Sequence, residues 1–241
     1  MSVIEDLATL SLDQIEEIKK LTMRWIFQAA MDFGFQSHDI FLQSPDEVKD
    51  VAEDIARELL DRLPGFNVPE RVYGTVDYKR ARYVVLPEKI VRQAVFIDSK
   101  AEKTGASARL QMSQMSLCVR QPARRVAIEE QGKLPTVYLT HSNQQYLTTT
   151  AFLHFMYSDD EKRRHHLKRL MIFCLPNGKL QQRYNPDANT GIWQTGAHSP
   201  RRGEKFRARV SFHKLKRAAK WRVQKIEFDA KSRACQGPWS E

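Results

Sequence analysis

The apolar positions of the first sixty residues repeat at helical spacing in two stretches. Ser11 and Gln14 have the spacing of a capping box, and Gly34 is a suitable stop for the helix that follows. Its apolar stripe consists of Ile15, Ile18, Thr22, Trp25, Ile26, Ala29 and Phe33. The second helix has Ser44 as its N-cap and Pro45 at its first position. Both helices are predicted within residues 11–63.

From residue 71 onward the pattern changes to the apolar and alternating runs that are typical of strands. The predicted strands cover residues 71–77, 81–86, 93–99, 149–157, 170–175, 206–212 and 221–228. Between them, residues 105–120 favour a helix with apolar contacts from Leu110, Met112, Met115 and Leu117. Helices followed by a mixed sheet predict one α/β domain over residues 1–241, with helices on the faces of a central sheet.

Composition adds a basic charge to this picture. The 241 residues include 39 Lys and Arg against 29 Asp and Glu, which gives a net charge of +10 and a pI near 9.6. This excess suits a polyanionic partner, nucleic acid first and an anionic membrane surface second. The three cysteines are isolated, so neither a disulfide framework nor a zinc ribbon is predicted. With no signal peptide and no long apolar run, we expect a cytoplasmic protein.

Two charges stand at the end of the strand predicted over 93–99. Asp98 and Lys100 lie on the same face of that strand, and Asp77 ends the strand predicted over 71–77. Because desolvating charges costs free energy, this placement suggests a cleft, a metal ion or a phosphate. Asp/Glu-x-Lys occurs six times in the chain, but only Asp98 combines a strand end, a lysine on its face and an acid on the neighbouring strand. A surface salt bridge at the sheet end remains the alternative.

Such a trio could support phosphodiester hydrolysis with Mg²⁺. Asp77, Asp98 and the main-chain carbonyl of Ser99 would be the metal ligands, since Mg²⁺ prefers oxygen. Lys100 would orient the attacking hydroxide and stabilise the transition state. Glu53, on the second predicted helix, is a candidate auxiliary acid beside Asp54, although a solvated helix face is the simpler explanation for either residue.

Basic residues gather before and within the strand predicted over 206–212. Alternation places Arg207, Arg209 and Ser211 on one face, opposite an apolar face that packs inward. Arginine can hold guanine O6 and N7 with two hydrogen bonds. The basic residues just upstream, within reach of bases or phosphates, are His198, Arg201, Arg202 and Lys205. A solvated basic strand is the alternative to DNA recognition by this segment.

Residues 76–80 and 96–101 together resemble the PD-(D/E)xK type II restriction endonucleases, and the SfiI type in particular. Val76 stands where the formal pattern of the superfamily has proline. The resemblance extends over residues 10–228 and includes segments 52–55, 182–187, 198–204, 210–215 and 221–222. This extent is far more specific than the catalytic tripeptide.

The resemblance implies a restriction-endonuclease-like core, a mixed central sheet flanked by helices, in which residues 11–63 form helices, 71–100 the catalytic strands and 176–213 the DNA-recognition region. It also implies Mg²⁺-dependent cleavage of double-stranded DNA at a G·C-rich palindrome, continuous or interrupted, that leaves 5′-phosphates. Mn²⁺ is expected to substitute. A homodimer or homotetramer matches the site's symmetry, and a cognate DNA methyltransferase is implied as a genetic partner. A structure-specific repair nuclease and a non-catalytic nucleic-acid-binding domain are the alternatives.

Overall fold

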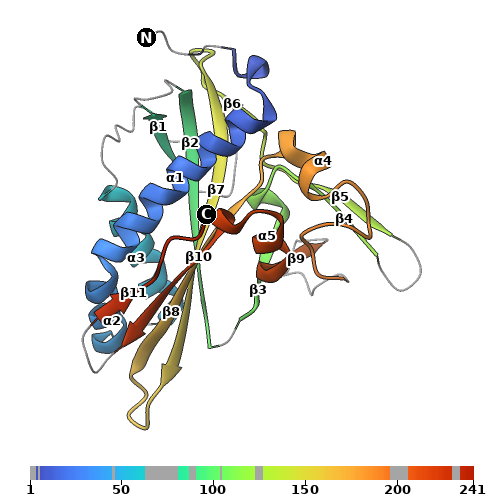
Figure 1. The fold of residues 1–241 in the computed structure, drawn as a ribbon. Helices are drawn as coiled ribbons and strands as arrows, with labels where there is room; N and C mark the ends of the chain where they lie inside the picture. The colour runs from blue at the N-terminus through green and yellow to red at the C-terminus, as the bar shows by residue number, and fades with distance from the viewer. Residues whose placement is uncertain are drawn as a thin grey trace.

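A central mixed β-sheet runs through the computed structural model of the chain (Figure 1). The structure describes residues 4, 6–44, 47–62, 81–86 (backbone only), 91–103, 105–122, 127–195, 206–229 and 234–241. The sheet strands are β1 (Ala81–Leu86), β2 (Val91–Glu102), β6 (Val137–Leu139), β7 (Gln145–Asp159), β8 (His165–Leu175), β10 (Val223–Asp229) and β11 (Ala234–Gln236). The order is β1-β2-β7-β8-β10-β11, with β6 also paired to β7. Among the described strands of this sheet, only β2 and β7 pair in parallel.

Three helices precede the sheet in the part of the chain that the structure describes, rather than the two predicted. They are α1 (Leu12–Asp32), α2 (Gly34–Gln43) and α3 (Val48–Asp61). The capping box of Ser11 and Gln14 is confirmed, and α1 ends at the cap residue Phe33. Gly34 does not stop the helical region, because α2 begins there directly.

The predicted start of the second helix is wrong by three residues. Ser44 is the C-cap of α2, and α3 begins at Val48, where the Glu47 carbonyl accepts hydrogen bonds from the N–H groups of Asp50 and Val51 (2.8 and 3.3 Å). Pro45 lies outside the described residues. The buried stripe of α3 contains Val51, Ile55 and Leu59, which repeat at helical spacing.

The helix predicted over residues 105–120 is absent. The chain instead forms β3 (Ser107–Gln111), a 3₁₀ turn η2 (Met112–Gln114) and β4 (Cys118–Gln121). β3 pairs with β9 (Arg207–Ser211), and β4 pairs with β5 (Ile128–Gln131). Ala108 and Leu110 are buried while Arg109 is exposed and Gln111 half-exposed, so an alternating pattern outweighed the apolar spacing on which the helix was predicted.

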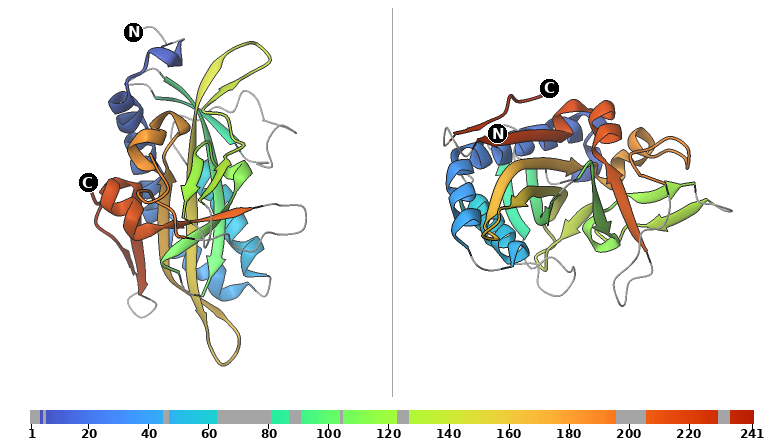
Figure 2. Two further views of the ribbon diagram at one scale, coloured as in Figure 1. Left: turned by 90° about the vertical axis from the view of Figure 1, so that its right-hand side faces the viewer. Right: turned by 90° about the horizontal axis from the view of Figure 1, so that it is seen from below.

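The β3–β9 and β4–β5 ribbons lie on the opposite side of the central strands from α2 and α3 (Figure 2). The same side carries α4 (Gln181–Tyr184) and α5 (Phe212–Ala218) (Figure 1). The short 3₁₀ turns are η1 (Leu7–Thr9), which precedes α1, η3 (Gly178–Leu180) and η4 (Lys220–Arg222). The ribbons and the central sheet face one another, so residues where the two meet can line a cleft that has the sheet on one side and a ribbon on the other.

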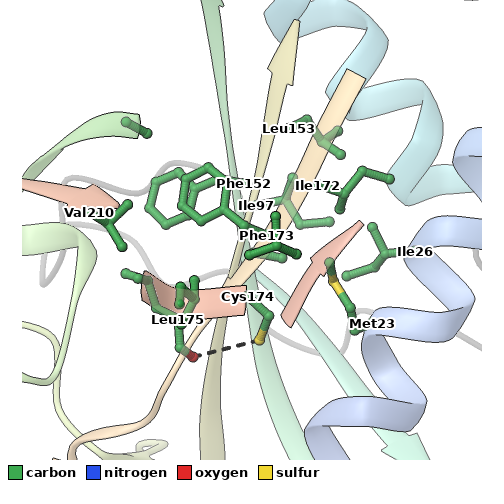
Figure 3. Packing of buried hydrophobic residues seen from close by; sticks show 14 of the residues in the cluster. Met23, Ile26, Ile97, Phe152, Leu153, Ile172, Phe173, Cys174, Leu175 and Val210 are labelled. Atoms are coloured by element: carbon green, nitrogen blue, oxygen red, sulfur yellow. Dashed lines mark hydrogen bonds between the residues drawn. The ribbon is translucent and has the colours of Figure 1, made fainter. Parts of the chain in front are cut away.

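The core is continuous on both faces of the sheet. Phe152 and Phe173 stack with their ring centroids 4.7 Å apart and lie toward Val210 of β9, whereas Leu153 and Ile172 lie toward α1 (Figure 3). All five side chains are fully buried. This packing on both faces fixes the register of β7 and β8, and with it the position of β2. None of the described helices is both long and apolar enough to cross a membrane.

Candidate functional site

Asp98 and Lys100 lie at the end of β2, on the face that looks toward the β3–β9 ribbon. They pair across the parallel register with Phe152 and His154 of β7. The Lys100 ammonium donates a hydrogen bond to Asp98 Oδ2, and both side chains keep 25% exposure. The structure therefore brings together the two charges that strand alternation had placed on one face.

A third residue completes the surroundings of this carboxylate. Gln114, in the turn η2, donates from Nε2 to Asp98 Oδ2 over 2.9 Å. Among the described residues nothing donates to the second oxygen, Oδ1. One oxygen of Asp98 is thus held by two donors, while the other is available to a ligand.

A cleft of about 480 Å³ opens beside Asp98. Its lining comes from three elements: α3, the end of β2, and the β3–β9 ribbon with η2. The lining residues are Lys49, Glu53, Asp98, Ser99, Lys100, Ala101, Glu102, Arg109, Gln111, Gln114 and Arg207. Four cations and three carboxylates line it, which suits an anionic ligand that binds together with a cation.

α3 brings only one of its two neighbouring acids to the cleft. Glu53 lines the cleft and forms an ion pair with Lys49 at 3.6 Å. Asp54 pairs with Arg57 at 3.0 Å and lies instead beside Phe33 and Ile40, in a separate groove between α2 and α3. The structure therefore favours Glu53, rather than Asp54, as an auxiliary acid.

The two arginines of β9 lie on one face of the strand, and both are partly enclosed. Ala208 and Val210 are fully buried on the opposite face, as expected, but Arg207 retains only 9% exposure and Arg209 is half-buried. Arg207 lines the cleft, and Arg209 Nη1 donates to Ser107 Oγ over 3.1 Å. Arg207 therefore faces the cleft, whereas Arg209 is held in part against β3.

Five predicted site residues lie outside the described residues, and six cleft residues were not predicted. Those outside are Asp77, His198, Arg201, Arg202 and Lys205. The missed ones are Lys49, Ala101, Glu102, Arg109, Gln111 and Gln114. The last three were hidden by the wrong helix over 105–120, although the alternation of Ala108 and Leu110 with polar neighbours was a signal for a strand.

The donors beside Asp98 are the hard oxygens that Mg²⁺ prefers. They are Asp98 Oδ1, the Glu53 carboxylate and the main-chain carbonyl of Ser99. No three His, Cys, Asp or Glu side chains of the described segments converge on a common point that would hold a metal ion. A site here would rest on two carboxylates, a carbonyl and water or phosphate oxygens, which is an ordinary ligand set for Mg²⁺.

Comparison with known proteins finds relatives that match nearly the whole chain. The family model described as "Type II restriction enzyme SfiI" matches residues 31–226. SfiI of Streptomyces fimbriatus is 35% identical over 250 residues, covering 98% of this chain and 93% of that protein.

Two solved structures share the fold. The crystal structure of tetrameric SfiI bound to cognate DNA matches with a TM-score of 0.86 and 31% identity, covering 99% of this chain and 93% of that one. The restriction endonuclease BglI, bound to its DNA recognition sequence, matches with a TM-score of 0.72 at 14% identity, covering 88% and 90%. The second likeness concerns the fold alone, and it confirms the predicted restriction-endonuclease-like architecture. Sequence and structure together show that this chain belongs to the SfiI family of type II restriction enzymes.

Proposed function

We propose that the chain hydrolyses one phosphodiester bond in each strand of a specific DNA duplex, with Mg²⁺, in the cleft beside Asp98. The observation that carries this proposal is the contact between Asp98 and Lys100 at the end of β2, in a cleft that also contains Arg109 and Arg207. Bound Mg²⁺ would supply an activated water and neutralise charge on the phosphate. Family membership supports the reaction class.

Each side chain of the cleft has a role that its position supports. Asp98 presents Oδ1 as a metal ligand, with the Ser99 carbonyl beside it. Lys100 is placed to orient the attacking hydroxide and to stabilise negative charge that develops on the phosphate oxygens. Arg109 and Arg207 face the same cleft from the ribbon, where guanidinium groups can hold phosphate oxygens or base edges. Glu53 would complete the metal surroundings from α3.

We infer from the sequence that Asp77 supplies the second carboxylate. It precedes the first residue of β1, Ala81, by four positions, so their Cα atoms are at most about 14 Å apart. Ala81 pairs with Phe96, two residues before Asp98. The length of chain between them therefore allows Asp77 to reach the metal. His198, Arg201, Arg202 and Lys205 are likewise proposed for DNA contacts, together with Arg207 and Arg209.

We further propose a G·C-rich palindromic target, 5′-phosphate products and a homodimer or homotetramer. Each subunit has one Asp98–Lys100 pair, so cutting two strands of a symmetric site requires two subunits related by a two-fold axis. The solved SfiI is a tetramer on cognate DNA, which supports self-association here. Mn²⁺ is expected to replace Mg²⁺, and a methyltransferase of the same specificity would protect the host DNA.

Plasmid digestion tests this function. A plasmid of known sequence is incubated with the protein and Mg²⁺, and the ends are mapped by sequencing. Discrete 5′-phosphate ends at one repeated palindrome are expected. Cleavage that follows DNA structure instead would indicate a repair nuclease. DNA binding without cleavage under any divalent metal would indicate a non-catalytic binding domain, and either result would overturn the proposal.

A further inference from the structure

The amide of Gln114 is engaged at both ends. Its Nε2 donates to Asp98 Oδ2 over 2.9 Å, and its Oε1 accepts from the N–H of Gln111 over 3.0 Å. Gln114 is 5% exposed. A buried amide with both ends bonded has one orientation, so its contact with Asp98 is fixed in direction.

Both donors to Asp98 reach the same oxygen. Lys100 and Gln114 each bond Oδ2, and no other described residue bonds the carboxylate. A lysine ammonium ends a flexible four-carbon chain and can follow a rotating carboxylate. The Gln114 amide cannot follow, because Gln111 and burial hold it. Gln114 is therefore the contact that determines which way Oδ1 points.

We propose that Gln114 is a positioning residue, which holds the Asp98 carboxylate with Oδ1 directed to the metal. This inference rests on the proposed function, in which Asp98 ligates Mg²⁺. Groups that hydrogen-bond a ligating carboxylate typically change metal affinity or activity by about 10- to 100-fold when they are removed. Gln114 occupies this position for Asp98.

The same residue ties the carboxylate to the β3–β9 ribbon. Gln111 ends β3 and pairs in register with Arg207 of β9. A continuous path therefore runs from Arg207 through Gln111 and Gln114 to Asp98. The carboxylate is held by the wall of the cleft that carries the arginines, and not only by its own strand.

The test uses Gln114→Met, which keeps the length of the side chain but removes both hydrogen bonds. Gln131→Met is the matched control: Gln131 lies in β5, is exposed, and donates one amide bond to the Ser116 carbonyl. Mn²⁺ affinity of the full-length protein is measured by the electron paramagnetic resonance of free Mn²⁺. Melting temperature, metal-free duplex binding and Mg²⁺-dependent plasmid cleavage are measured in parallel.

Gln114→Met is expected to weaken Mn²⁺ binding about 10- to 100-fold. Its cleavage should fall and then recover partly at high Mg²⁺, while metal-free duplex binding stays within about two-fold of wild type. Gln131→Met should leave Mn²⁺ affinity and cleavage unchanged. Unchanged Mn²⁺ affinity in Gln114→Met, with active wild type, would overturn the inference and leave the proposed function standing. Parallel loss of folding, duplex binding and Mn²⁺ binding would show a purely structural role. A wild type that neither binds Mn²⁺ nor cleaves would instead refute the proposed function.

Discussion

His154 of β7 lies directly opposite Lys100 of β2 across the parallel pair, and its side chain is fully buried. Its Nε2 is 3.7 Å from Glu102 Oε2, and neither ring nitrogen forms a hydrogen bond with a described residue. Burial first, and then the charges of Lys100 and Arg209, lower the pKa of His154 to about 4. The imidazole is therefore neutral at neutral pH, which keeps a further positive charge away from Lys100.

The low pKa of His154 predicts a loss of stability in mild acid. Between pH 6.5 and 4 the unfolded state binds a proton that the folded state excludes, so the free energy of unfolding falls as the pH decreases. The shift in the pKa of His154 corresponds to a loss of ~3 kcal/mol in the free energy of unfolding, and this loss is complete only below pH 4. We expect urea unfolding of His154→Leu to lack this part of the decline, so that the variant approaches or exceeds wild-type stability at pH 4.5. Equal pH slopes for the two proteins would show that His154 does not titrate in this way.

Asp98→Asn and Lys100→Ala should abolish cleavage without preventing DNA binding. Asparagine keeps the shape of aspartate but removes the charge that holds the metal, and alanine removes the cation next to the phosphate. We expect a loss in cleavage rate of about 10²- to 10³-fold or more for each variant. Duplex binding without metal, measured by gel shift, should persist. Since Mg²⁺ binding needs the carboxylate, calorimetric Mg²⁺ binding should weaken in Asp98→Asn.

Asp229→Asn is the control for these two variants. Asp229 begins another Asp-x-Lys sequence and ends β10, but it does not line the cleft. Its substitution should leave the cleavage rate unchanged. If Asp229→Asn lowered the cleavage rate as much as Asp98→Asn does, the proposal that the catalytic site lies at the end of β2 would be contradicted.

Glu53 and Asp54 form a second matched pair. Glu53→Gln should raise the Mg²⁺ concentration that gives half-maximal cleavage, by about 10-fold, because a carboxylate that approaches the metal becomes a neutral amide. Asp54→Asn should have no such effect, since Asp54 lies in the groove beside Phe33 and Ile40. The measurement is the cleavage rate as a function of Mg²⁺ concentration. Identical curves for Glu53→Gln and wild type would remove Glu53 from the site.

Local patterns predicted the parts of the site that depend on one strand or one helix. Alternation along β2 placed Asp98 and Lys100 together, and the stripe of α3 left Glu53 at its edge, because both periodicities act within a single element. Gln114 and Arg109 were missed because their position depends on the pairing of β3 with β9, about a hundred residues later in the chain. The residue preferences within 105–120 carry no information about this distant strand, and the pairing with β9 outweighed the local preference for a helix.

The pattern of apolar residues also did not predict that α1 buries charged side chains in the interior. Lys19 is fully buried and donates to the Thr148 carbonyl (2.6 Å) and to Thr149 Oγ1 (2.8 Å). Glu16, one turn earlier, faces the same region. A helical stripe identifies which face is covered, but the partners that make a buried charge tolerable come from distant strands.

The ion pair between Glu16 and Arg222 predicts a large loss of stability when one partner is removed. Arg222 is fully buried, and its Nη2 lies 2.6 Å from Glu16 Oε2, while its other nitrogens donate to the Tyr184 hydroxyl and the Cys174 carbonyl. Glu16→Gln leaves the guanidinium without its counter-charge, at a cost of about 3–5 kcal/mol. Urea unfolding at pH 7 and fixed protein concentration measures this loss.

Two further variants test whether the loss of stability in Glu16→Gln comes from the unpaired buried charge of Arg222. Asp13 lies on the same helix as Glu16 and forms an ion pair with Arg183 of α4 at the protein surface. Asp13→Asn breaks this pair, and it should change the free energy of unfolding little. The double variant Glu16→Leu/Arg222→Met removes both charges, so it should recover much of the stability that Glu16→Gln loses. If the double variant is instead as unstable as the sum of the two single variants, the packing of these side chains, rather than the unpaired charge, determines the loss.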